Sequence, residues 1–82
     1  MTKREFIKQY ESAMRQGYKY IGVEAMMNGN TDPEYIINKV SNFDSKLEYY
    51  KKAYNDNMQL ITNNSISIIN IMVGNRLSLP IL

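Results

Sequence analysis

Tyrosine and lysine stand side by side at two places in the chain, and this is the most suggestive residue chemistry in it. The first place is Tyr18-Lys19-Tyr20, and the second is the run 49–54, which reads Tyr-Tyr-Lys-Lys-Ala-Tyr. Tyrosine rings stack on bases, and ammonium groups hold phosphates. The outward members of both runs are therefore candidate nucleotide- or nucleic-acid-binding residues: Tyr18, Lys19, Tyr20, Tyr49 and Lys52.

In a competing interpretation, the residues of these runs are ordinary surface residues without a ligand. If the second run is helical, Tyr50 and Tyr54 fall on the apolar stripe of that helix, which leaves Tyr49 and Lys52 outward. Glu48 lies one turn before Lys52 and offsets part of its charge. A solvated helix face above core tyrosines explains the same residues without a ligand.

Catalytic and metal chemistry have little support. The chain contains no His and no Cys, which excludes disulfides and makes zinc and most transition-metal sites very unfavourable. The loop 28–34 alternates oxygen ligands, but Pro33 and Lys39 stand where a calcium loop needs Gly and Glu. No pair of acids, lysines or tyrosines is forced together by its spacing. We expect no enzyme activity, no cofactor and no metal.

Composition favours a small cytoplasmic protein. Ten Lys and Arg against eight Asp and Glu give a net charge of +2, too slight to indicate nucleic acid alone. The start of the chain resembles no secretory signal, and the apolar run 66–73 is too short to span a membrane. Phe, Tyr, Met, Ile, Asn and Lys supply 42 of the 82 residues. These amino acids have AT-rich codons, which suggests a low-GC bacterium or one of its phages.

The first third of the chain predicts two short elements. Thr2 and Glu5 have capping-box spacing, and Gly17 fits a left-handed C-terminal cap, so a helix is expected over 3–16. The segment 18–27 alternates like a strand but also has a helical apolar face, and a short helix is favoured over a strand. A loop over 28–32 follows.

The rest of the chain predicts one long helix. Neither Gly nor Pro occurs from Glu34 to Val73, and apolar residues recur there at spacings of three and four. Asn55-Asp56-Asn57 is the weakest point of a helix over 33–73. Such a helix would be about 60 Å long, whereas a compact chain of this size has a radius of gyration of about 12 Å. The expected fold class is all-α, with the long helix assembled into an oligomeric helical bundle.

The predicted interface is the apolar stripe of that helix together with the apolar tail over 74–82. The alternative is that the stripe receives the first helix within one chain. The interface residues expected from the stripe and the tail are Ile36, Val40, Phe43, Leu47, Tyr50, Tyr54, Ile61, Ile68, Met72, Leu77 and Leu79.

These observations predict a non-enzymatic helical interaction protein. A homo-oligomer encoded by a phage or mobile element, which binds and inhibits a host defence protein in the bacterial cytoplasm, is the favoured function. The alternative is an oligomer that sequesters a nucleotide or nucleic acid in Tyr- and Lys-lined pockets between subunits.

Overall fold

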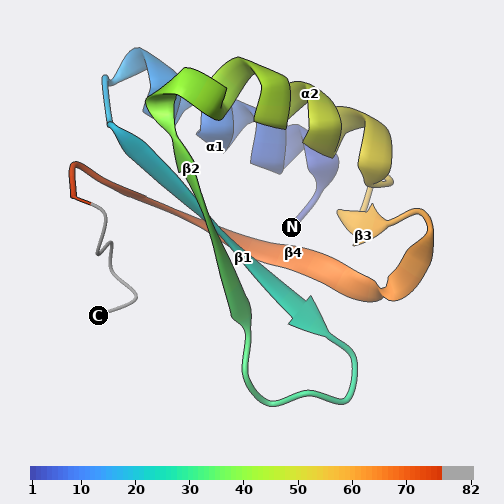
Figure 1. Ribbon diagram of the computed structural model, residues 1–82. Coiled ribbons are helices and arrows are strands. Elements are labelled where there is room, and N and C mark those ends of the chain that lie inside the picture. Colours follow the sequence, from blue (N-terminus) through green and yellow to red (C-terminus); the bar gives the residue numbers. More distant parts are fainter. Residues whose placement is uncertain (77–82) are drawn as a thin grey trace.

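Two helices lie side by side on one face of a four-stranded antiparallel sheet (Figure 1). The structure is a computed structural model and describes residues 1–76. The strand order is β2-β1-β4-β3. The elements in chain order are α1 (Lys3–Arg15), β1 (Tyr20–Met27), β2 (Glu34–Lys39), the 3₁₀ turn η1 (Val40–Asn42), α2 (Phe43–Ala53), β3 (Gln59–Leu60) and β4 (Asn63–Gly74).

The prediction of an all-α fold with a long helix over 33–73 is wrong. That range contains three strands and only the 11-residue α2. Residues four positions apart lie on the same face of both a helix and a strand, so the apolar stripe could not distinguish a helix from a strand. In β4, β-branched Ile and Val alternate with Ser, Asn and Met, and such residues favour strands. The helical bundle predicted from the long helix is therefore also wrong.

The preference for a short helix over 18–27 is likewise wrong, because this segment contains the central strand β1. Both of its long edges are paired: Val23 lies opposite Ile36 of β2 and opposite Ile71 of β4. Every second side chain of β1 points to the face below the helices, and these side chains are buried: Ile21, Val23 and Ala25. A strand with two partners gains hydrogen bonds and burial that outweigh local helix propensity.

Local hydrogen bonds explain why α2 stops early. The side-chain Oδ1 of Asn55 accepts hydrogen bonds from the backbone N–H groups of Asn57 at 2.9 Å and Gln59 at 3.0 Å. Met58 takes a left-handed φ of 57° in the same turn. These bonds replace the helical ones and reverse the chain after Ala53, so that β3 can enter the sheet.

The helix α1 begins at the capping box seen in the sequence. The N–H of Glu5 donates to the Thr2 hydroxyl at 3.1 Å, and the N–H of Thr2 donates to the Glu5 carboxylate at 2.8 Å. The second bond lowers the pKa of Glu5 because it stabilises the carboxylate. At the other end, Gly17 has a φ of 81°, which a side chain disfavours.

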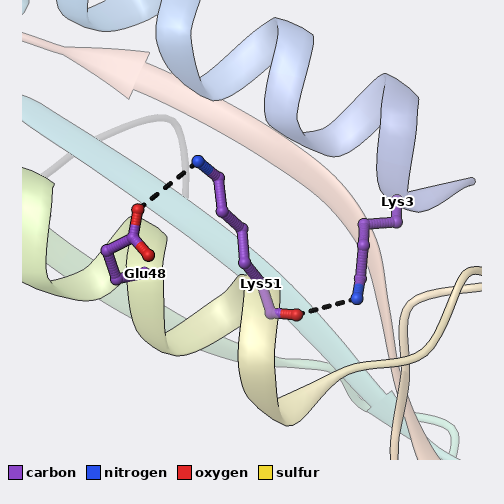
Figure 2. A network of polar contacts seen from close by, with 3 residues as sticks. All are labelled: Lys3, Glu48 and Lys51. Carbon is purple, nitrogen blue, oxygen red and sulfur yellow. Dashed lines mark hydrogen bonds and ion pairs between the residues drawn. The ribbon is translucent and has the colours of Figure 1, made fainter.

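A lysine contact joins the start of α1 to the end of α2 (Figure 2). Nζ of Lys3 donates a 2.8 Å hydrogen bond to the backbone oxygen of Lys51. A cation at the carbonyl end of a helix is stabilised by the helix dipole. The neighbouring ion pair between Lys51 and Glu48, at 3.4 Å, is exposed and adds little.

The core fills the space between the two helices and the sheet, and it is rich in aromatic rings. Rings of Phe6 and Tyr50 meet edge to face with centroids 5.1 Å apart, a favourable arrangement. The chain has a radius of gyration of 12.2 Å, so one chain covers its own core. Within residues 1–76, neither helix is both long and apolar enough to cross a membrane.

The residues predicted for an intersubunit seam have different places. Five of them lie in the core of a single chain: Phe43, Leu47, Tyr50, Tyr54 and Ile68. Ile36 and Met72 are half-buried in the sheet, whereas Val40 and Ile61 are exposed. Leu77 and Leu79, with the predicted role of the apolar tail, lie outside the described residues.

Candidate binding surface

The face of the sheet opposite the helices is not covered by any helix or strand among the described residues (Figure 1). Side chains alternate between the two faces of a strand. Because Ile21, Val23 and Asn38 point toward the helices, their neighbours in the strands point outward. We call this the outer face. Its residues are Tyr20, Gly22, Glu24 and Met26 of β1, Tyr35, Ile37 and Lys39 of β2, and Ser67, Asn70 and Met72 of β4.

An apolar row crosses the middle of the outer face. Gly22 of β1 lies opposite Ile37 on one side and Met72 on the other. Ile37 and Met72 are half-buried, and Gly22 between them has no side chain. Tyr35, in the next row, is 42% exposed. A partly apolar row with an aromatic ring beside it is suited to contact with another protein.

Positive charge collects at one end of the sheet. The chain leaving α1 and the ends of β2 and β4 meet there: the N–H of Val40 donates to the backbone oxygen of Lys19 at 3.0 Å, and the N–H of Lys19 donates to Oδ1 of Asn75 at 3.2 Å. The basic end consists of Lys19, Lys39 and Arg76. Glu34, at the start of β2, and Asp32, in the loop before it, lie at the opposite end, and Glu24 lies in the row next to the apolar row, so positive and negative charges are separated along the strands.

The ligand-binding residues predicted from the sequence lie in two separate places in the structure. Tyr18, Lys19 and Tyr20 lie at the basic end, and Tyr20 is opposite Lys39. Tyr49 and Lys52 are on α2, on the other side of the sheet, so the two groups do not form one pocket within a chain.

Sequence reasoning missed Lys39 and Arg76 as members of the basic end. Neither is near Tyr20 in the sequence, and only the strand register brings them together: Tyr20 lies opposite Lys39 and opposite Gly74, two residues before Arg76. No local motif marks either residue. The pairing of β1 with its two neighbours would have been needed to find them.

Two open grooves on the helices are weaker candidates. One, of about 540 Å³, runs between α1 and α2 over an apolar floor of Met14 and Leu47. The other, of about 470 Å³, runs along α1 past Ile7. Four basic and two acidic side chains line the groove along α1, and three acidic and two basic side chains line the groove between the helices. Both grooves are open, and neither has charge of a single sign.

The strongest perturbation of titrating groups occurs in the core. The hydroxyls of Tyr10 and Tyr50 both donate to Oδ1 of Asn38, at 2.8 and 3.3 Å. Burial raises the pKa of Tyr50 to about 12 and also raises that of Tyr10. Both phenols stay protonated at neutral pH and remain donors. Since all three side chains are at most 2% exposed, this cluster holds the fold together and offers no access to a substrate.

Comparison with known proteins adds no constraint to this surface. No protein-family model, curated protein or solved structure matches the chain. The outer face, its apolar row and its separated charges are therefore the features that indicate a function.

Proposed function

We propose that the chain is a non-enzymatic binding protein that occupies the surface of another protein with the outer face of its sheet. The observation that carries this proposal is the apolar row of Ile37, Gly22 and Met72 on a sheet face that neither helix covers. An antiparallel sheet can leave one face to solvent, but such a face is normally polar. Here an apolar row lies between charged ends, the arrangement of an interface core with a polar rim.

Inhibition of a host protein by a phage or mobile-element product, inside the bacterial cytoplasm, is the form of this function that we favour. Its support is the small size of the chain and its AT-biased composition. A protein that acts by covering a surface needs no catalytic group. Self-association belongs to the same proposal, because a second copy would double the area available for contact.

The test is a comparison of two glutamate substitutions at apolar residues. Met72→Glu places a charge in the apolar row, whereas Ile61→Glu makes the same change at a residue that is 57% exposed after β3. Tagged wild-type, Met72→Glu and Ile61→Glu chains are used to capture proteins from a low-GC bacterial host. The captured protein is then purified and its affinity measured by calorimetry. Wild type and Ile61→Glu should bind alike, and Met72→Glu should bind at least about tenfold more weakly. Equal affinity of all three chains would reject the outer face as the contact.

A second candidate function is binding of a nucleotide or single-stranded nucleic acid at the basic end. The observation that favours it is the strand register, which places Lys39 opposite Tyr20 and brings Lys19 and the segment before Arg76 to the same end of the sheet. Stacked bases and phosphate contacts would then supply the affinity, which falls steeply as salt rises. Apolar docking changes far less with salt.

Fluorescence anisotropy with a labelled oligothymidine at low and high salt tests this second candidate. Lys19→Ala should weaken binding by about tenfold. Lys46→Ala, on α2, serves as the charge-matched control and should leave it unchanged. Absence of binding by the wild type at low salt would exclude this function and leave protein binding as the better explanation.

A further inference from the structure

The strand β2 forms an open edge of the sheet. It is the last strand in the order, and within residues 1–76 no strand lies beyond it. In an antiparallel ladder, alternate residues direct both backbone groups to the same neighbour. Because the N–H of Val40 donates to Lys19, the groups of Asn38 and Ile36 also face β1. The residues that direct N–H and C=O toward the open edge are Tyr35, Ile37 and Lys39.

We propose that this edge binds the same edge of a second copy of the chain, so that two sheets join through antiparallel β2 strands. Ile37 lies on the two-fold axis, opposite the partner's Ile37, and Tyr35 lies opposite the partner's Lys39. In this register every outward backbone group of Tyr35, Ile37 and Lys39 gains a partner. The inference names the contact for the self-association included in the proposed function, and it does not depend on what the outer face binds.

Charge complementarity supports this register. The two-fold axis reverses one sheet relative to the other, so the basic end of each copy lies beside the acidic end of its partner. On the outer face, the partner's Lys39 continues the row that contains Tyr35 and Glu24. Edge lysines usually discourage strand pairing. In this register Lys39 meets a ring and then a carboxylate, whereas a shift that set Lys39 opposite itself would bring like charges together.

The apolar residues near this edge support the same contact. Tyr35 is 42% exposed, Val40 62% and Tyr49 50%. The α2 residues that face α1 include Asp44 and Glu48, so Tyr49 lies on the flank of α2 away from α1. Since α2 contacts β2 and α1 contacts β4, that flank lies on the β2 side of the molecule.

Sedimentation equilibrium of the full chain without ligand tests the proposal. At about 100 μM the wild type should have twice the 9.6 kDa mass of the chain. Tyr35→Lys sets like charges opposite each other at two symmetric places and should weaken association at least about tenfold. Adding Lys39→Glu to Tyr35→Lys restores opposite charges and should return the affinity to within about threefold of wild type. Ile61→Lys, beyond the far edge of the sheet, is the matched control and should not change the mass.

A cysteine variant tests the register independently. The chain contains no Cys, so Ile37→Cys introduces a single thiol. Directly opposed residues of a hydrogen-bonded pair have Cα atoms about 5.5 Å apart, within the range of a disulfide. Mild oxidation should link Ile37→Cys into a covalent dimer, whereas Ile61→Cys should stay monomeric at the same concentration.

Three results would overturn the inference. One is a wild type that is monomeric at this concentration. Another is a dimer whose affinity Tyr35→Lys does not change while the circular dichroism spectrum remains native. The third is a mass that rises without limit, which indicates open pairing of β2 with the opposite edge of the sheet, where the two-residue β3 pairs with only part of β4. None of these results bears on capture of a partner by the outer face, which Met72→Glu tests separately.

Discussion

The hydroxyl of Tyr10 donates a 2.8 Å hydrogen bond to Oδ1 of Asn38, and this contact ties α1 to the edge strand β2. The same oxygen accepts a bond of 3.3 Å from the hydroxyl of Tyr50, which adds α2 to the connection. Asn38 is 1% exposed and is the one buried polar residue among those described. Three elements thus meet at a single amide oxygen.

Replacing this amide should destabilise the fold. Asn38→Ala leaves the hydroxyls of Tyr10 and Tyr50 without their acceptor and opens a small cavity. The expected loss is about 2–4 kcal/mol of unfolding free energy. Urea unfolding followed by circular dichroism measures it. Asn70→Ala, at an exposed asparagine of β4, is the matched control and should cost less than about 0.5 kcal/mol. An equal effect of the two substitutions would show that the buried hydrogen bonds contribute nothing.

Stability should fall in alkaline solution. Burial raises the pKa of Tyr50 to about 12 in the folded chain, and that of Tyr10 is also raised. An unfolded tyrosine ionises near pH 10, so between pH 10 and 12 the unfolded state has fewer bound protons than the folded state. The stability present below pH 10 is therefore lost as the pH rises. Each such tyrosine adds a slope of about 1.4 kcal/mol per pH unit.

Unfolding free energies at pH 9, 10 and 11 check the direction of this dependence. Tyr50→Phe removes one of the buried phenols and should make the slope shallower. Tyr49→Phe, at a tyrosine that is 50% exposed, is the control and should keep the wild-type slope. A pH-independent free energy over this range would contradict the burial of both phenols.

Local features of this fold could be predicted from the sequence because the interacting residues are neighbours. The capping residues Thr2 and Glu5 are three positions apart, and their hydrogen bonds need no distant partner. The turn after α2 is also local, since Asn55 satisfies the N–H groups of Asn57 and Gln59. The sequence indicated that Asn55 weakens a helix, but an apolar stripe that continued past it favoured the wrong outcome.

The sheet could not be predicted from periodicity because its pairings are distant in the sequence. Val23 depends on Ile36 and Ile71, which are 13 and 48 positions away. In the candidate site, too, only the features local in the sequence could be predicted. The run Tyr18-Lys19-Tyr20 was visible as composition, whereas the place of Lys39 beside it follows only from strand register.

Loss of the capping box should weaken α1 without changing the core. Thr2→Ala removes the acceptor for the N–H of Glu5 and should cost about 1 kcal/mol. Thr2→Ser keeps a hydroxyl in place and should remain within about 0.3 kcal/mol of wild type. Thermal unfolding of the two variants provides the comparison. Identical melting temperatures for Ala and Ser would show that the cap does not contribute.

At Met58 the backbone is strained while the side chain is fully buried, and the expected free energies of the two effects predict which one dominates. Its φ of 57° disfavours a side chain, yet that side chain is 0% exposed. Met58→Gly should relieve about 1 kcal/mol of strain but lose about 2–5 kcal/mol of packing. The net effect is then a destabilisation of roughly 1–4 kcal/mol. Met58→Leu keeps the volume and the strain and should cost less than about 1.5 kcal/mol. If urea unfolding finds Met58→Gly more stable than wild type, the strain of this turn exceeds the value of the buried side chain, and the turn rather than the core limits the stability of the fold.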